Sequence, residues 1–322
     1  MILPSSGGAP RFAYGETRTI HRLRVDPGPT GLGDPEAPHL AVVIDVETTG
    51  LDRQRDRIIE LALRQFRYDD EGRITNIGRS FTWLQDPGRP LTEEIMKLTG
   101  LNDDMLSGQS IDKGLAARIL RRVDLVVAHN ASFDRPRVED EVPEAAGAPW
   151  GCSCAEIGWR DFGFDGRSLG YLLTQAGYYN AAHRAADDVD STIALLAHEV
   201  VSGRTALLDL IERSSKATWI VRAKGAAFDS KELLKQRGYR WDVDLKVWFV
   251  EVPDREKEER WLLTNIYAPS ANAQALGPEW IRISARNRWN PGTQAKGTID
   301  YPKVDDLAFK PAAGTALLGS SP

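Results

Sequence analysis

The pattern of apolar and polar positions predicts a mixed α/β unit in the first two thirds of the chain. LAVVIDVE is apolar and β-branched and predicts a buried strand, and RIIELALRQFRY and residues near 80–84 predict two more. Apolar residues recur at helical spacing in PLTEEIMKLTGL, IDKGLAARILRRV, RSLGYLLTQAG and DDVDSTIALLAHEVV, and the strand DLVVAHN lies among them. Three hairpin-like strands followed by alternating helices and strands predict one mixed sheet flanked by helices.

One helix in this unit contains a proline. ASFDRPRVEDEV has the form of a helix start, and Pro136 lies within it. Because proline lacks an amide N–H and its ring clashes with the preceding turn, we expect Pro136 in the first turn or at a break in the helix.

The pattern begins again near Lys216 and predicts a second, smaller α+β unit. ATWIVRA, KVWFVEV and WIRISA read as strands, and SKELLKQRGY and EKEERWLLTNIY read as helices. The expected organisation is therefore a flexible leader at 1–37 that adds an edge strand, a main domain at 38–205, a linker at 206–215, a small basic, aromatic-rich domain at 216–290, and a disordered Pro/Gly/Ala/Ser-rich tail at 291–322.

Charge divides the chain in the same place. Residues 1–215 carry 24 Lys and Arg against 33 Asp and Glu, whereas residues 216–303 carry 16 against 11 and hold six of the nine tryptophans. Such a basic, aromatic stretch is compatible with nucleic-acid binding, with protein contact or dimerisation, or with a stabilising role alone. Nucleic-acid binding would use the basic side chains at 224, 231, 235, 237, 240 and 246, and truncation near residue 214 would remove the whole unit.

Two acids interrupt the first buried strand. Asp45 and Glu47 stand two residues apart in IDVETTG, so a strand projects both from one face. Burying two like charges unpaired costs several kcal/mol (roughly). Either each acid has an arginine or backbone partner, or a cation lies between them.

Two later motifs extend this acidic set. HNASFD places Asp134 just after a predicted strand, and HRAADD places His183 five residues before Asp188. With DVETTG, these three motifs resemble the DEDDh group of the DnaQ-like 3′→5′ exonucleases over residues 38–202. The resemblance implies a ribonuclease H-like fold, and motif spacing favours Asp188 over its neighbour Asp187.

The resemblance also implies a catalytic set and its cofactor. Asp45, Glu47, Asp134 and Asp188 would hold two Mg²⁺ (or Mn²⁺) ions about 4 Å apart, since hard cations prefer carboxylate oxygens. His183 would act as general base toward the attacking water because its ordinary pKa is near neutral. The reaction implied is hydrolysis at single-stranded 3′ ends, releasing nucleoside monophosphates.

Four further positions are implied to contact substrate or support the site. Thr48, Thr49 and Leu51 would lie where the terminal nucleotide docks, and Asn130 would hold the second motif by hydrogen bonds. His129 and Phe133 are interpreted as packing residues.

Partners and location are expected on the same basis. The partners would be single-stranded DNA or RNA 3′ ends, with DNA favoured, and a homodimer or a polymerase or repair partner is compatible with the sequence. An RNase T- or oligoribonuclease-like RNA exonuclease and a catalytically weak nucleic-acid-binding scaffold stay open as alternatives. Cys152 and Cys154, too few for a disulfide framework, are expected as reduced thiols in a cytoplasmic protein without a membrane span.

Overall fold

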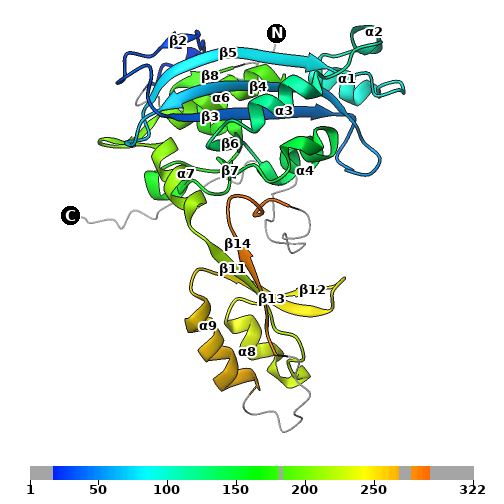
Figure 1. Cartoon of the computed structure of the whole chain (residues 1–322), viewed down its shortest axis with the longest axis vertical. Coiled ribbons are helices and arrows are strands. Elements are labelled where there is room, and N and C mark those ends of the chain that lie inside the picture. Colours follow the sequence, from blue (N-terminus) through cyan, green and yellow to red (C-terminus); the bar gives the residue numbers. More distant parts are fainter. Residues whose placement is uncertain (1–16, 181–183, 268–276, 291–322) are drawn as a thin grey trace, which may run out of the picture.

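The main sheet has six strands and mixed direction. The computed structural model describes residues 17–180, 184–267 and 277–290 and shows two units, each built on its own sheet (Figure 1). The larger sheet runs in the order β2 (Gly28–Pro29), β5 (Ile74–Leu84), β4 (Ile58–Tyr68), β3 (His39–Thr48), β6 (Leu125–Ala128), β7 (Trp150–Cys152). Strands β3, β4 and β5 pair antiparallel, while β3, β6 and β7 pair parallel. The expected α/β, ribonuclease H-like mixed sheet is confirmed, although β5 begins earlier than predicted and β7 was not anticipated.

Helices cover both faces of this sheet because β3 is apolar on both. Val42, Ile44 and Val46 face a core shared with α3 (Lys113–Leu120) and α4 (Ala131–Glu141). Ala41 and Val43 face the opposite core, shared with α5 (Leu169–Gln175), α6 (Ala185–Ala197) and α7 (Ala206–Ser215). The period-two alternation of β3 therefore decides which helices its acids can meet.

Shorter elements complete the larger unit. They are α1 (Glu93–Thr99), α2 (Asp103–Leu106), the 3₁₀ turns η1 (Pro143–Ala145) and η2 (Trp159–Phe162), the parallel pair β1 (His21–Arg22) and β8 (Tyr178–Tyr179), and the hairpin β9 (Glu199–Val201) and β10 (Arg204–Thr205). Among the described residues, no helix has the length and apolar character needed to cross a membrane.

The described part of the leader adds an edge strand to the sheet, as expected, and is docked there rather than flexible. Strand β2 pairs with β5 at the sheet edge, and the Thr30 hydroxyl donates to the Ile74 carbonyl at 2.7 Å. The buried Arg64 guanidinium donates to the carbonyl of Val25 at 3.0 Å. These backbone contacts are long-range, so local composition does not reveal them. Residues 1–16 lie outside the described residues.

The expectation of a linker at 206–215 is also wrong, because these residues form helix α7. Thr205 caps the helix by accepting from the Leu208 N–H, and Leu207 and Leu210 are fully buried in the core beside α6. A segment with this burial stabilises the larger unit rather than connecting two units loosely.

Pro136 neither begins nor breaks its helix. It is the sixth residue of α4, which continues to Glu141. Tertiary contacts hold the helix on both sides of the proline: the Arg135 side chain donates to the Ala285 carbonyl, and the Arg137 side chain donates to the Leu51 carbonyl. These contacts offset the lost backbone hydrogen bond, so the sequence-based expectation was wrong.

The smaller unit is a four-stranded antiparallel sheet with helices on it. Its strand order is β12 (Arg240–Asp242), β13 (Val247–Val252), β11 (Thr218–Arg222), β14 (Glu279–Ile283), and its helices are the 3₁₀ turn η3 (Phe228–Ser230), α8 (Lys231–Gln236), α9 (Arg255–Leu262) and the π-helical η4 (Leu263–Tyr267). Val221, Leu234, Tyr239, Leu262 and Ile266 form its buried core.

Arg237, one of the candidate phosphate contacts, is exposed as expected, but its charge is paired within the smaller unit. Arg237 pairs with the buried carboxylate of Glu258 at 2.9 Å, lies over the Trp261 ring at 4.9 Å, and shares Glu258 with the Tyr239 hydroxyl. Arg237 is therefore removed from the set of candidate phosphate contacts.

The chain returns from the smaller unit to the larger one in a segment that we call the strap, residues 284–290. The Ala285 carbonyl accepts from the Trp150 N–H at 2.8 Å, and Trp289, only 6% exposed, belongs to the core beneath α3 and α4. Arg288 forms an ion pair of 2.6 Å with Glu156, and both side chains are 9% exposed. Truncation near residue 214 would therefore remove part of the core of the larger unit along with the smaller one. Residues 291–322, expected as a tail, lie outside the described residues.

Candidate active site

Three acids meet where β3 ends. Asp45 and Glu47 lie on the face of β3 that carries Ala41 and Val43, which α6 covers, and Asp188 lies in the first turn of α6. One carboxylate oxygen from each of the three lies within 4.8 Å of the others. We call Asp45, Glu47 and Asp188 the acidic cluster.

Asp134 lies beside this cluster and is not one of the three. It belongs to α4, which packs on the opposite face of the sheet, and its side chain is 2% exposed. Its Oδ1 accepts a hydrogen bond from the Val46 N–H at 3.3 Å. Asp134 is nevertheless close enough that its charge raises the pKa of Asp45. The structure thus brings together three of the four predicted metal ligands, with Asp134 adjacent and bonded to β3.

Burial and mutual repulsion act strongly on these carboxyls. Desolvation raises the pKa of Glu47 to about 7, with Asp188 and Glu60 adding repulsion. The pKa of Asp134 rises to about 8 through desolvation, opposed by the Val46 N–H. For Asp45, burial first and then the charges of its acidic neighbours raise the pKa well above its ordinary value. Such a set of desolvated like charges is typical of a site that a cation completes.

Glu60 is a fifth acid at this site, beside the cluster and Asp134, and no role was predicted for it from the sequence. It lies on β4 directly opposite Glu47 and is fully buried. Its Oε1 pairs with Arg184 at 2.8 Å, and its Oε2 accepts from the Ala185 N–H at 3.1 Å. Glu60 therefore anchors the start of α6, the helix that carries Asp188. The sequence signal for Glu60 was its position as an acid inside the apolar run RIIELAL, where a buried carboxylate needs a partner.

The positions predicted to contact substrate lie along the segment after β3. Thr48 is buried and its hydroxyl donates to the Gly50 carbonyl at 2.6 Å. The Thr49 hydroxyl bonds to Asp56 at 3.0 Å and accepts from Arg89 at 2.8 Å. Leu51 is 85% exposed. Two of these three side chains are thus held by the fold, and Leu51 offers free apolar surface.

The second motif has a bent backbone that its polar residues stabilise. Asn130 precedes α4 with φ of 101°, in the left-handed region that asparagine tolerates better than most residues, and its Oδ1 accepts from the Ser132 hydroxyl at 2.8 Å. Burial lowers the pKa of His129 to about 4, and its ring bonds Ser153 and the Arg167 carbonyl. These contacts favour the packing interpretation of His129.

The third motif is described only from residue 184 onward. His183 lies outside the described residues. Asp187 adjoins Asp188 in the first turn of α6 but is not a member of the acidic cluster, and the residue at the N-cap position is Arg184. The choice of Asp188 over Asp187 agrees with this geometry.

The donor set of the acidic cluster fits a divalent cation. Carboxylate oxygens are the ligands that Mg²⁺ and Mn²⁺ prefer, and three converge here, with raised pKa values at Asp45 and Glu47. A bound cation would offset the repulsion that raises those values.

The chain is similar to known exonucleases and polymerases over part of its length. Residues 42–148 match the family model described as Exonuclease (RNase_T). The chain is 42% identical over 95 residues to "DNA polymerase III PolC-type" of Halalkalibacterium halodurans and 43% identical over 95 residues to that of Bacillus subtilis. Each match covers 29% of this chain and 6% of the relative, so the chain spans a small part of these relatives' length.

Two solved structures are also similar to the chain. "Exonuclease X in complex with 5' overhanging duplex DNA" shares 27% identity, covering 53% of this chain and 98% of that chain, with a TM-score of 0.40. "Exonuclease I (apo)" shares 16% identity, covering 58% of this chain and 50% of that chain, with a TM-score of 0.41.

The mixed sheet, the acidic cluster and the family match define a nuclease domain of the DnaQ/RNase T type. Residues 42–148 match the exonuclease (RNase_T) family model, and the chain is similar there to DnaQ-like exonuclease domains.

Proposed function

We propose that the protein is a metal-dependent 3′→5′ exonuclease that hydrolyses phosphodiester bonds at single-stranded 3′ ends and releases nucleoside monophosphates. The observation that carries this proposal is the acidic cluster at the end of β3, within a domain of the DnaQ-like family. A scaffold protein has no need of three converging, partly buried carboxylates that repel one another, because they destabilise the fold unless a cation offsets them.

The proposed cofactor is a pair of Mg²⁺ or Mn²⁺ ions. Asp45, Glu47 and Asp188 would hold them together with Asp134, which lies beside the cluster. Bound there, the ions supply positive charge that activates water and stabilises the charge developing on the phosphate. Glu60 and Arg184 hold the start of α6, which keeps Asp188 in reach of β3.

His183 is proposed as the general base. Five residues before Asp188 in the sequence, it would accept the proton of the attacking water, since an imidazole of ordinary pKa is neutral for much of the time near pH 7. Activity should then rise with pH near neutrality, and His183→Ala should flatten that rise.

Substrate contacts are proposed for the segment after β3 and for the second motif. Leu51, 85% exposed, would pack against the terminal base, while Thr48 and Thr49 would contact the terminal nucleotide from positions that their hydrogen bonds keep rigid. Asn130 would support the start of α4. DNA is favoured over RNA as substrate because the matched relatives carry the name DNA polymerase.

A matched pair of variants tests the metal-dependent activity. End-labelled dT oligonucleotide is incubated with the wild-type chain, Asp45→Asn or Asp187→Asn in Mn²⁺, and the release of dTMP is followed. Asp45→Asn should lower the rate by at least about 10³-fold, since it removes a charge that the transition state requires. Asp187→Asn should stay near wild type because Asp187 is outside the cluster.

Chelation completes the test. Excess EDTA should abolish dTMP release and added Mg²⁺ or Mn²⁺ should restore it. Full activity in EDTA, or equal losses in the two variants, would refute the assignment of the acidic cluster.

A further inference from the structure

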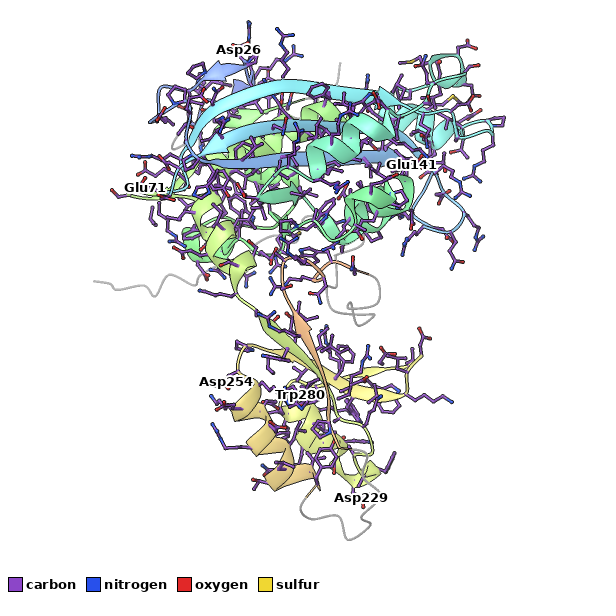
Figure 2. All side chains as sticks on the ribbon, in the orientation of Figure 1. Asp26, Glu71, Glu141, Asp229, Asp254 and Trp280 are labelled. Atoms are coloured by element: carbon purple, nitrogen blue, oxygen red, sulfur yellow. The ribbon has the colours of Figure 1, made fainter. Side chains whose placement is uncertain are left out.

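A second concave site lies in the smaller unit, on elements separate from those of the acidic cluster. It is a pocket of about 750 Å³ between the end of β11, the turn η3 with the start of α8, and the β12–β13 hairpin. Figure 2 shows Asp229, the neighbour of Phe228 in this pocket, at the end of the smaller unit remote from the six-stranded sheet. We call this site the basic-aromatic pocket.

Basic side chains dominate the polar lining of the pocket. Arg222, Lys224, Lys231 and Lys246 line it with a single acid, Glu279. Arg222 and Lys224 both reach Glu279, at 3.3 and 3.1 Å, so that acid offsets only part of their charge. Lys246 forms no ion pair among the described residues, and the nearest partner of Lys231 is Glu232 at 3.8 Å. The pocket therefore has excess positive charge in a concave surface, which attracts anions.

Aromatic rings stand open beside these amines. Phe228 is 82% exposed and Trp241 is 46% exposed, and the Lys231 amine lies 5.4 Å from the centroid of the Phe228 ring. Trp248 packs against Trp241 in an edge-to-face arrangement, with ring centroids 5.4 Å apart. Rings of this size are usually buried, and exposed ones that line a pocket with cations point to a planar, anionic ligand.

The hairpin that carries Lys246 is locally stabilised. The Asp242 carboxylate accepts from the N–H groups of Asp244 and Leu245, at 3.0 and 2.9 Å, and Lys246 follows with φ of 51°. A lysine in the left-handed region costs some stability that glycine or asparagine would avoid.

We propose that the basic-aromatic pocket binds single-stranded polynucleotide, with bases stacked on Trp241 and Phe228 and phosphates contacted by Lys231 and Lys246. This proposal rests on the proposed function, because it assigns the pocket to the same strand that the acidic cluster cleaves. The two sites lie on different units, so the pocket anchors a strand at a distance from its 3′ end.

Binding is measured separately from cleavage in order to test this. Anisotropy of fluorescein-labelled dT30 and rU30 is recorded with the full chain in EDTA, over a range of salt concentrations. Trp241→Ala should weaken binding by about 5- to 150-fold, the range expected when one base loses its stacking partner. Lys246→Asn should make the fall of log affinity with log salt shallower by about 0.7, the value for one single-strand phosphate contact.

Two further variants separate binding from folding. Arg260→Ala removes one charge from the exposed face of α9, outside the pocket, and should change affinity little. Trp241→Phe keeps a ring and should retain most of the affinity that Trp241→Ala loses. Unchanged thermal unfolding of both Trp241 variants would show that lost binding is local.

The outcomes discriminate between the two proposals. Weaker binding of dT30 alone supports a DNA site, and weaker binding of both strands supports a site for either nucleic acid. If the Trp241 and Lys246 variants match wild type and Arg260→Ala with both strands, the pocket proposal is overturned. If the variants lose binding although the wild-type chain releases no dTMP in Mn²⁺, the pocket proposal stands and the exonuclease proposal fails.

Discussion

Replacing Glu47 with glutamine should stabilise the metal-free protein while weakening its response to metal. The pKa of this carboxyl rises from 4.5 to about 7 because of burial and the neighbouring acids. An increase of that size corresponds to about 3 kcal/mol of destabilisation once the carboxyl is ionised. Glu47 is partly exposed, so solvent screening reduces the expected gain from Glu47→Gln to about 2 kcal/mol.

The sign of the effect depends on pH. Since the folded-state pKa lies above the unfolded value, the carboxyl costs no stability below about pH 4.5, and its cost grows until pH passes about 7. Glu47→Gln should therefore unfold at higher urea than wild type at pH 8 in EDTA, and the difference should shrink toward pH 5. When Mn²⁺ is a hundredfold above its Kd, it should raise the free energy of unfolding of the wild-type protein by about 2.7 kcal/mol. The increase should be smaller for Glu47→Gln, because glutamine is a poorer metal ligand.

Urea unfolding in EDTA and in Mn²⁺ measures both effects. Glu144→Gln is the matched control, since Glu144 is exposed on η1 and forms no ion pair among the described residues. If Glu47→Gln is less stable than wild type at pH 8 in EDTA, the carboxylate makes a net favourable contact and the metal-site reasoning is wrong.

Two further predictions concern positions that support the site and the strap. Arg288→Ala should lower the free energy of unfolding at pH 7, measured in urea, by about 3–5 kcal/mol, because the Glu156 carboxylate stays buried without its arginine partner. The control Arg286→Ala should lower it by less than about 1 kcal/mol. Similar losses in the two would contradict a buried pair. Glu60→Gln should weaken Mn²⁺ binding about 10- to 100-fold, measured from the rise in Tm across a Mn²⁺ titration, since Arg184 and the start of α6 lose their charged anchor. An unchanged titration would remove Glu60 from the support of the site.

Much of the site could be predicted because its signals are local. Asp45 and Glu47 share a face by the two-residue period of a strand, and motif spacing selected Asp188 over Asp187, in agreement with the observed cluster. The distinct place of Asp134 was not predictable. It follows from α4 packing on the opposite face of the sheet, which is a tertiary arrangement.

What the sequence reading missed depends on long-range contacts. Residues 284–290 resemble the end of a basic module, and nothing local indicates that Trp289 fills the core of the other unit. Arg237 resembles its solvent-facing neighbours, and only its pairing with Glu258 on another helix shows that it is structural. Pro136 looked like a helix boundary because the contacts that hold α4 come from residues distant in sequence.

The strap has a consequence for the order in which the chain can fold during synthesis. The ribosome has completed the strands and helices of the larger unit by residue 215. Arg288 and Trp289 follow only after the smaller unit has been made. Until then Glu156 lacks its arginine partner and the core beneath α3 and α4 lacks an indole. The larger unit therefore reaches its final packing only after the smaller unit has emerged, although the larger unit is translated first.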